Sequence, residues 1–384
     1  ATLNPNLASV DGTPLEASRS WKFVTLQPGY QSYSPQLNEL HVRLDAPVTV
    51  TFNMAMNPTS VETAFRLVDQ DNKHIYQPGL LFVPFGIYRP HDIVKPRATS
   101  VHRGVHLEKS GYVDTETDTS TVRLSHRDDH PCDCRMVPTE SRIVPAETEG
   151  LLGPGWQKNT FDFYTLEGAE QLFYAMEHFE TGRLVLNVAE MPIKCPVAPL
   201  EFLFLADWFF HQKGVRDQVE LVYATPLDGA FTKPRASAIL GGLLEEKGVK
   251  VETEFNASEV DGEQRILSSW DGREVRYDML VTIPTNMGSE AVERSNMGDD
   301  LSFIPTDKHT LRSKEWKNIF VLGDATDLPS SKAGSVAHFQ GDILEKNVLR
   351  AITGRKLRED FDGHANCFIE TGFGKAVLID FNYD

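Results

Sequence analysis

Several features that define broad classes of protein are missing from this chain of 384 residues. It contains no run of about 18 uncharged apolar residues, so the sequence predicts no transmembrane helix. Its four cysteines are too few for a scaffold built on disulfides. Basic side chains are outnumbered, because 38 Lys and Arg stand against 55 Asp and Glu, for a net charge of -17. This balance argues against a surface that tracks nucleic-acid phosphates.

What is present is the composition of a globular protein, 40% apolar and 24% charged, at a length typical of two or three domains. Residues 20–25 and 40–52 alternate between polar and apolar side chains, as half-buried strands do. Two short motifs resemble the end and the start of bacterial Ig-like repeats: DGTPL at 11–15 with WKF at 21–23, and PVTVTF at 47–52 with MNP at 56–58. We therefore expect an all-β Ig-like segment before residue 68; the alternative is another small β module.

After about residue 68 the pattern changes to alternating strands and helices. We expect strands at 184–188, 219–223, 277–283 and 318–324, and helices at 200–212 and 233–247. Such alternation indicates βαβ units and a parallel sheet.

The clearest chemical signal follows the apolar run 318–322. Gly323 permits a close approach of the backbone, and Asp324 places a carboxylate at the carboxyl edge of the sheet, where α/β folds bind ligands. A few residues later, Lys332 precedes Ala333-Gly334, which open a helix whose free N–H groups suit an anion or an electron-rich ring. Gly-Asp alone is often an acidic helix cap, but these flanking residues favour a ligand site.

This segment resembles the second FAD motif of flavoproteins with two dinucleotide-binding domains, in particular sulfide:quinone oxidoreductases and the flavin subunit of flavocytochrome c sulfide dehydrogenase. The resemblance extends from about Val68 to Asp384. It is carried by further motifs in the same order: YQPGLLFVPFG at 76–86, KCPVAPLE at 194–201, YDMLV at 277–281 and GHANCFIE at 363–370. It implies FAD as cofactor, sulfide as substrate, a quinone or a cytochrome as acceptor, and peripheral attachment to one face of a membrane.

Cys195 stands between a predicted strand and a helix that begins near Leu200. A pyridine-nucleotide domain would need G-x-G-x-x-G at this turn, but residues 191–198 contain no glycine, so NAD binding is disfavoured. We expect the helix N-terminus and Lys194 to lower the pKa of the Cys195 thiol. The alternative, which stays open, is that a lone buried cysteine serves only in packing.

The resemblance implies that Cys195 and Cys367 form a redox disulfide beside the flavin. Sulfide would attack this disulfide to give a persulfide, a thiolate would then attack the flavin, and the electrons would leave to the quinone. Glu201 is a candidate proton acceptor near the thiols, or else an acid favoured by the helix N-terminus.

The same resemblance assigns the adenosine ribose to Asp69 and cofactor contacts to Gln77 and Pro78. It places an apolar quinone surface at Phe82, Phe85 and Phe381. Asp69 could instead be a solvated loop acid, and phenylalanines are more often core residues.

Two departures from the family pattern bear on cofactor binding. No G-x-G-x-x-G occurs before residue 68, so the FAD domain is incomplete and we expect FAD to bind poorly. At 132–142 the family has a strand that ends in glycine, whereas this chain has CDCRMVPTESR. Arg135 and Pro138 are unfavourable in a buried strand, and Glu140 replaces the glycine.

We interpret residues 132–142 as a damaged strand that is left as a surface loop. His126, His130, Cys132 and Cys134, with Asp128 and Asp129, could instead be zinc ligands. All of them lie within nine residues, and the sequence offers no second, separate pair of ligands to complete a zinc site, so we predict no metal site.

Together these observations predict an α/β fold of two Rossmann-like dinucleotide-binding-type domains, with the FAD domain incomplete and an all-β Ig-like appendage. We expect the Ig-like segment at 1–67, the FAD-domain remainder at 68–170, the second Rossmann-like domain at 171–290, and the return to the FAD domain at 291–384. The predicted function is a flavin-dependent sulfide:quinone oxidoreductase-like protein with impaired activity. The alternatives are a non-catalytic fused chain and a type II NADH:quinone oxidoreductase.

Overall fold

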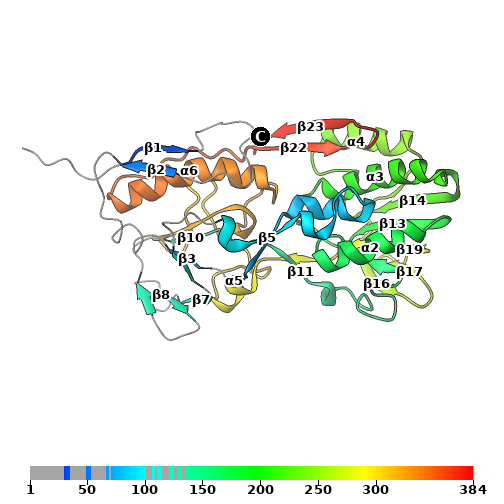
Figure 1. Ribbon diagram of the computed structural model, residues 1–384, viewed down its shortest axis with the longest axis horizontal. Helices are drawn as coiled ribbons and strands as arrows, with labels where there is room; N and C mark the ends of the chain where they lie inside the picture. Colours follow the sequence, from blue (N-terminus) through cyan, green and yellow to red (C-terminus); the bar gives the residue numbers. More distant parts are fainter. Residues whose placement is uncertain are drawn as a thin grey trace, which may run out of the picture. The chain divides into compact units, whose positions relative to one another are not determined.

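The computed structural model describes residues 71–100 and 135–383, with the side chains of 71–99 and 135–383 (Figure 1). Outside these ranges it describes only the backbone of short strands: β1 (Tyr30–Ser34), β2 (Thr49–Phe52), β3 (Arg66–Val68), β6 (His106–Glu108), β7 (Ser110–Asp114), β8 (Thr121–Leu124) and β9 (Asp129–Pro131). The chain forms two compact units, residues 1–67 with 98–107, and residues 68–97 with 108–384.

The predicted Ig-like segment falls in the first unit and lies almost entirely outside the described residues. Within it, β1 pairs with β2 in antiparallel fashion, with Tyr33 opposite Val50. The Ig-like identity stays a prediction. Asp69 and the side chains of the alternative zinc set, from His126 to Cys134, also lie outside the described part of the chain.

A five-stranded parallel sheet is the centre of the second unit. Its strands lie in the order β12 (Thr160–Phe161), β19 (Met279–Ile283), β13 (Gly182–Val188), β14 (Val219–Ala224) and β15 (Lys250–Glu252). The strands expected at 184–188, 219–223 and 277–283 are confirmed with small shifts of their ends. The parallel arrangement also confirms the α/β class.

Both faces of this sheet are covered, which explains why its strands are nearly continuous apolar runs. Leu184 and Leu186 of β13 point into one core, which they share with α2 (Leu166–His178), α3 (Ala198–Lys213) and α4 (Pro234–Glu246). Val185, between them, points to the other face. There it meets a three-stranded antiparallel sheet, β16 (Ala257–Asp261), β17 (Ile266–Ser269) and β18 (Glu274–Arg276). The parallel sheet is thus the middle of three layers.

The segment interpreted as a damaged strand is still a strand, so the expected surface loop is wrong for residues 135–137. These residues form β10 (Arg135–Val137), which pairs in parallel with β21 (Ile319–Val321). Pro138 follows the strand, so its missing N–H removes no bond from the ladder. Arg135 and Val137 are buried while Met136 is 57% exposed, which is the alternation of an ordinary strand.

The remaining elements complete the surroundings of the site. The short strands are β4 (Lys73–Ile75), which pairs with β5 (Val94–Pro96), and β11 (Arg142–Ile143), which pairs with β20 (Asn286–Met287). The helices are α5 (Glu290–Arg294) and α6 (Gly334–Ile352), and 3-10 turns include η1 (Gln77–Leu81), η2 (Val83–Phe85) and η7 (Gly323–Ala325). Within the described residues, no helix is both long and apolar enough to span a membrane.

The hairpin β22 (Ala365–Glu370) and β23 (Ala376–Phe381) packs by one strand against α3 and α6. Its turn lies close to α3, because a Cβ on Gly372 would approach the Phe204 carbonyl oxygen to 2.9 Å. Gly372 also has a positive φ of 76°, which glycine adopts at little cost. The outer face of the hairpin carries the cross-strand pair Phe368 and Leu378, which are 73% and 54% exposed.

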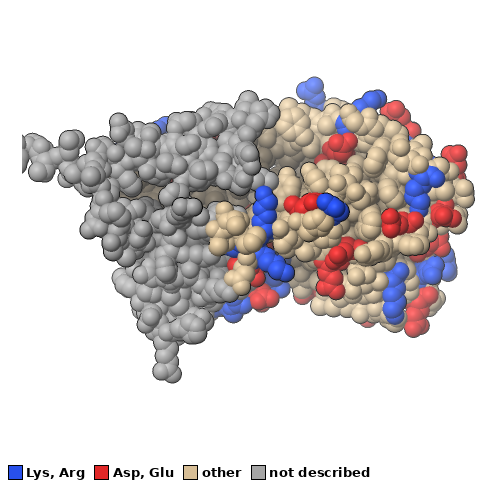
Figure 2. Space-filling view, viewed as in Figure 1, with Lys and Arg blue, Asp and Glu red and all other residues tan. Residues whose placement is uncertain are grey.

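Acidic and basic side chains are interspersed on the face of the described part that Figure 2 shows. No extended basic patch gathers on that face, in keeping with the excess of acids in the sequence.

A buried carboxylate fixes the C-terminal half of α3. Asp207 is 3% exposed, and its two oxygens accept hydrogen bonds from Arg216 Nε at 2.7 Å and Lys247 Nζ at 3.0 Å. Arg216 is the first residue of η6 (Arg216–Gln218), which leads into β14, and Lys247 follows α4, so the contact joins α3 to both ends of the following βα unit.

We expect Asp207→Ala to lower the free energy of unfolding by about 3–5 kcal/mol, because it leaves two largely buried cations without their anion. The matched control is Glu220→Ala, which removes a 30% exposed carboxylate paired with Arg183 and Lys250 and should cost about 1 kcal/mol or less. Urea unfolding followed by circular dichroism measures both, and equal losses would contradict the assignment.

Candidate functional site

The two candidate redox cysteines come from separate elements of the second unit. Cys195 lies in the turn between β13 and α3, and Cys367 lies in β22, opposite Ile379 of β23. Both are free thiols, both are half-buried, and both pack against the core that α3 shares with the parallel sheet. The fold therefore brings together residues that are far apart in the sequence.

Hydrogen bonds on both sides hold the Cys195 turn. Cys195 has a positive φ of 51°, a conformation that costs energy for a residue other than glycine. Its N–H donates to the Lys332 carbonyl at 2.7 Å, and its carbonyl accepts from the Ala198 N–H at 2.9 Å. The preceding residue, Lys194, is held as well, because the Tyr164 hydroxyl donates to its carbonyl at 2.6 Å and its N–H donates to Asn286 Oδ1 at 3.0 Å.

The expected lowering of the Cys195 pKa is wrong. Burial raises the pKa of this thiol well above its usual value, and the nearby Glu201 and Cys367 raise it further. The Ala198 N–H at the start of α3 lowers the pKa, but by less than burial raises it. Lys194 does not compensate, because its ammonium group donates to Gln77 Oε1 at 2.9 Å. Burial also raises the pKa of Cys367, to about 11.

Glu201 connects the two elements that carry the thiols. It lies in the first turn of α3, is 7% exposed, and accepts a hydrogen bond from the Glu370 N–H of β22 at 3.0 Å. Burial raises the pKa of Glu201 to about 7, against the opposing effect of that hydrogen bond. A carboxyl group with this pKa can exchange a proton at neutral pH, as the prediction for Glu201 requires.

The residues expected to contact a cofactor surround the end of β21. Asp324, in η7, accepts a hydrogen bond from Ser141 Oγ at 3.1 Å, and Gly323 has a positive φ of 64°. Lys332 is buried and donates to the carbonyls of Asp324 at 2.9 Å and Thr326 at 2.7 Å. Burial lowers the pKa of Lys332 to about 8. Lys332 thus fixes the loop after Gly-Asp through its backbone, and does not reach outward.

Helix α6 begins at Gly334 with Ala333 as its N-cap, and no side chain caps its first N–H groups. A Cβ on Gly334 would meet no atom within 4 Å, so space remains in front of this end of the helix. The role of Ala333 and Gly334 as a site for an anion or an electron-rich ring stays a prediction.

A chain of polar side chains crosses the candidate cofactor site. Glu140 Oε2 accepts from Gln77 Nε2 at 2.8 Å, and Gln77 Oε1 accepts from Lys194 at 2.9 Å. Pro78 follows in the first turn of η1 and makes no polar contact of this kind. Sequence reasoning missed Ser141 and the role of Glu140, because residues 132–142 were interpreted as damaged.

The three phenylalanines proposed for a quinone surface are not brought into one cluster. Phe85 is 5% exposed and packs against Phe202, and Phe82 packs on the same core. Phe381 packs instead on the core around α6, where Lys233 lies 5.7 Å from its ring centre. Phe85 is therefore a core residue.

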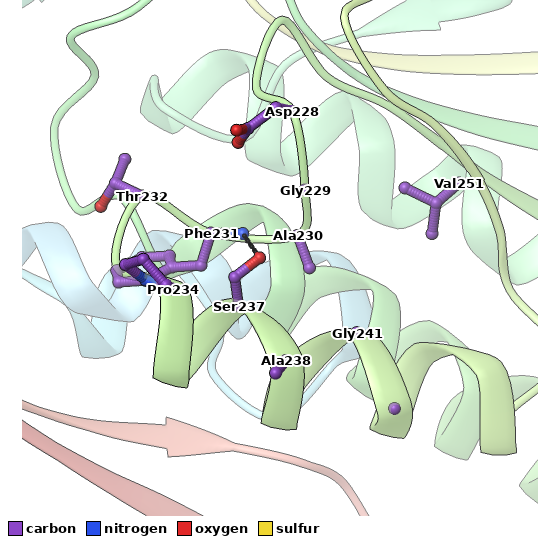
Figure 3. A pocket seen from close by; sticks show the side chains of 11 residues that line it. Asp228, Gly229, Ala230, Phe231, Thr232, Pro234, Ser237, Ala238, Gly241 and Val251 are labelled. Atoms are coloured by element: carbon purple, nitrogen blue, oxygen red, sulfur yellow. Dashed lines mark hydrogen bonds between the residues drawn. The ribbon is translucent and has the colours of Figure 1, made fainter.

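A cavity of about 530 Å³ lies beyond the end of β14, away from these residues (Figure 3). It is lined by the loop Asp228–Thr232 and the first turns of α4, and the Ser237 hydroxyl oxygen accepts a hydrogen bond from the Phe231 N–H at 3.2 Å. The thiols, Glu201 and Asp324 do not line it. Among the residues with described side chains, no group of three His, Cys, Asp or Glu is placed to hold a metal ion.

FAD is the cofactor that the family resemblance implies, and the residues around the end of β21 offer groups of the kind that its flavin and ribityl end would need. Asp324 offers a carboxylate beside the uncapped N-terminus of α6. Gln340, fully buried on α6, accepts from the Gly323 N–H at 2.6 Å, and its amide nitrogen is buried without a partner. A buried donor without an acceptor beside Gly323 is the kind of group that a bound ligand satisfies.

The raised pKa of Glu201 should make the free energy of unfolding depend on pH. The folded state holds a proton on Glu201 between pH 4.5 and about 7, whereas the unfolded state releases it. The free energy of unfolding of the natural chain should therefore fall as pH rises through this window, by up to about 3 kcal/mol. Glu201→Gln keeps an acceptor for the Glu370 N–H and removes the titration, so its advantage should grow from pH 4.5 to pH 8. Urea unfolding at the two pH values tests this, and a constant difference between the two proteins would contradict it.

Comparison with known proteins places these observations in context. A scan of protein-family models finds no match. The mitochondrial sulfide:quinone oxidoreductase of Dictyostelium discoideum is 26% identical over 322 residues, which cover 83% of this chain and 71% of that protein. The mitochondrial sulfide:quinone oxidoreductase of Mus musculus is 23% identical over 329 residues, covering 83% and 72%.

Solved structures agree on the fold. The sulfide:quinone oxidoreductase of the hyperthermophilic bacterium Aquifex aeolicus matches with a TM-score of 0.66 at 16% identity, over 82% of this chain and 80% of that one. A chain in the mitochondrial ATP synthase of Tetrahymena thermophila matches with a TM-score of 0.68 at 18% identity, over 83% and 80%. The chain is thus similar in sequence to mitochondrial sulfide:quinone oxidoreductases, and its α/β fold resembles that of the solved sulfide:quinone oxidoreductase.

Proposed function

We propose that this chain oxidises sulfide with a quinone as acceptor, and that Cys195 and Cys367 are its redox pair. The observation that carries the proposal is the meeting of both thiols and Glu201 on one core, although they come from the start of α3 and from β22. The relatives named sulfide:quinone oxidoreductase support the substrate and the acceptor.

The reaction begins with the cysteines joined as a disulfide. Hydrosulfide attacks one of the two sulfurs, so a bond from the substrate sulfur to that cysteine forms while the disulfide bond breaks. The products are a persulfide on one cysteine and a thiolate on the other. FAD, when bound, supplies the two-electron relay from this pair to the quinone.

Protons must move in this cycle, because burial raises the pKa of both thiols and the reduced pair holds its protons at neutral pH. Glu201 is the carboxyl group that acts on both, and its pKa of about 7 lets its oxygens accept a proton from sulfide or from a thiol. Its hydrogen bond to β22 keeps the carboxyl beside Cys367 throughout.

Asp324 and the first turn of α6 would hold the cofactor at the end of β21. The Asp324 carboxylate would accept hydrogen bonds from the ribityl hydroxyls, and Ser141 orients that carboxylate. The N–H groups that follow Ala333 would face the electron-rich edge of the ring. A quinone acceptor further implies contact with a membrane surface, and which membrane face is involved stays open.

We also propose that this chain holds FAD weakly. The sequence before residue 68 contains no G-x-G-x-x-G, so the diphosphate lacks the backbone N–H groups that this turn provides. The purified chain should contain well below one FAD per polypeptide, and a fluorescence titration should give weak binding. A yellow protein with one tightly bound FAD per chain would overturn this part of the proposal without touching the roles of the cysteines.

With FAD in excess, the chain should reduce a soluble quinone analogue when sulfide is added, and Cys195→Ser or Cys367→Ser should each abolish this. Ser237→Ala is the matched control and should keep the activity, because Ser237 lines the cavity at the first turns of α4, which neither thiol lines. NADH in place of sulfide should give no reduction, because residues 191–198 contain no glycine turn. Persistence of sulfide-dependent reduction in both Cys variants, or reduction by NADH, would favour the alternatives instead.

A further inference from the structure

The loop between β12 and α2 places Tyr164 against the Cys195 turn. Asp162, which is 1% exposed, accepts hydrogen bonds from the Tyr164 N–H and the Thr165 N–H, both at 2.8 Å. Aspartate commonly fixes a turn in this way, and Thr165 is the N-cap of α2. The backbone of Tyr164 is therefore held locally, by the residue two positions before it.

Packing also fixes the Tyr164 ring, which belongs to a side chain that is 7% exposed. The rings of Phe163 and Tyr164 meet edge-on with their centres 5.1 Å apart, and Phe163 stacks on Phe202 of α3 at 5.0 Å. Burial raises the pKa of the Tyr164 hydroxyl well above its ordinary value, and the nearby Cys195 raises it further. The hydroxyl therefore keeps its proton at neutral pH and acts as a hydrogen-bond donor, not as an acid.

This hydroxyl reaches one end of the peptide unit that joins Lys194 to Cys195. It donates to the Lys194 carbonyl oxygen at 2.6 Å, while the Cys195 N–H of the same peptide unit donates to the Lys332 carbonyl oxygen at 2.7 Å. A peptide unit is planar, so its C=O and its N–H turn together. Two hydrogen bonds, one from the loop before α2 and one to the loop before α6, thus hold both polar ends of one rigid group.

Cys195 would not favour this orientation by itself. Its φ of 51° lies in the left-handed region, which is disfavoured for any residue that has a Cβ. Turning the Lys194–Cys195 peptide unit to face the opposite way would return φ to ordinary negative values, but it would break both hydrogen bonds. The Ala198 N–H, which donates to the Cys195 carbonyl at 2.9 Å, belongs to a contact of the next peptide unit and does not prevent this rotation.

We propose that Tyr164 is a positioning residue whose hydroxyl locks the Lys194–Cys195 peptide unit and so holds the Cys195 sulfur where Cys367 can bond to it. The inference rests on the proposed function and deepens it, because it adds a residue that prepares the redox pair without touching the substrate. Cys367 lies inside β22, in a regular ladder with β23. The conformation of the Cys195 turn therefore decides how often the two sulfurs meet.

The test measures how readily the two thiols form a disulfide. The full chain, free of sulfide and quinone, is equilibrated with mixtures of reduced and oxidised glutathione, and the peptides linked through Cys195 and Cys367 are quantified by mass spectrometry. In this exchange the two protein thiols give two electrons and two protons to oxidised glutathione, which leaves as two molecules of reduced glutathione. The equilibrium constant reports how well the turn presents one sulfur to the other, and it sets the reduction potential of the pair.

Tyr164→Phe keeps the packed ring and removes only the hydroxyl. It should lower this equilibrium constant about fivefold, because one neutral hydrogen bond changes an equilibrium by about this factor and the turn then spends less time in the reactive conformation. Hydrogen exchange of the amides in residues 191–198 should become faster by about the same factor, since the Cys195 N–H leaves the Lys332 carbonyl more often.

Tyr277→Phe is the matched control, because it makes the same chemical change on the other face of the parallel sheet. Tyr277 is 3% exposed, and its hydroxyl lies 3.2 Å from Thr160 Oγ1. This variant should leave both measurements unchanged.

The inference is overturned if Tyr164→Phe leaves the equilibrium constant or the amide exchange unchanged, if it raises the constant, or if Tyr277→Phe lowers the constant equally. These outcomes are distinct from a failure of the proposed function. If the natural chain forms no link between Cys195 and Cys367, the proposed redox pair fails and this inference fails with it. If all three proteins form the link with the same constant, only this inference fails.

Discussion

The Cys195 N–H donates to the Lys332 carbonyl, and the candidate site depends on this backbone hydrogen bond. Cys195 belongs to the turn after the central strand of the parallel sheet, whereas Lys332 belongs to the loop that leads into α6. Lys332 is in turn fixed by its buried ammonium group, which bonds the carbonyls of Asp324 and Thr326. One connected set of hydrogen bonds therefore runs from the first thiol to the Gly-Asp turn, so the thiol and the candidate cofactor carboxylate cannot move independently.

The sequence was a good guide wherever apolar residues form long runs. Strands β13, β14 and β19 are buried on both faces, so their nearly continuous apolar composition predicts them correctly. The ends of α3 and α4 are marked by Gly214 and Gly248, which follow these helices with positive φ, as helix-ending glycines do. The position of Cys195 between a strand and a helix followed from the same pattern.

Properties set by distant contacts could not be predicted in this way. The Cys195 pKa follows from burial by segments on both sides of it in the sequence, and Lys194 points to Gln77, which is 117 residues away. Likewise, β10 forms although its segment contains Arg135 and Pro138, two residues that disfavour a buried strand. It pairs with β21, and Pro138 lies after its last residue. The identity of residues 1–67 and the position of Asp69 remain predictions.

The hairpin β22–β23 gives the second thiol an unusual dependence on register. Cys367 faces inward toward α3 and α6, and the next residue, Phe368, faces outward. Since neighbouring side chains of a strand point to opposite faces, a slip of one residue would carry a phenyl ring to Glu201 and expose the sulfur to water. The turn at Gly372, pressed against the backbone of α3, blocks that slip. Gly372 takes no part in the chemistry, but by fixing the register of β22 it determines that Cys367, and not Phe368, faces the candidate redox site.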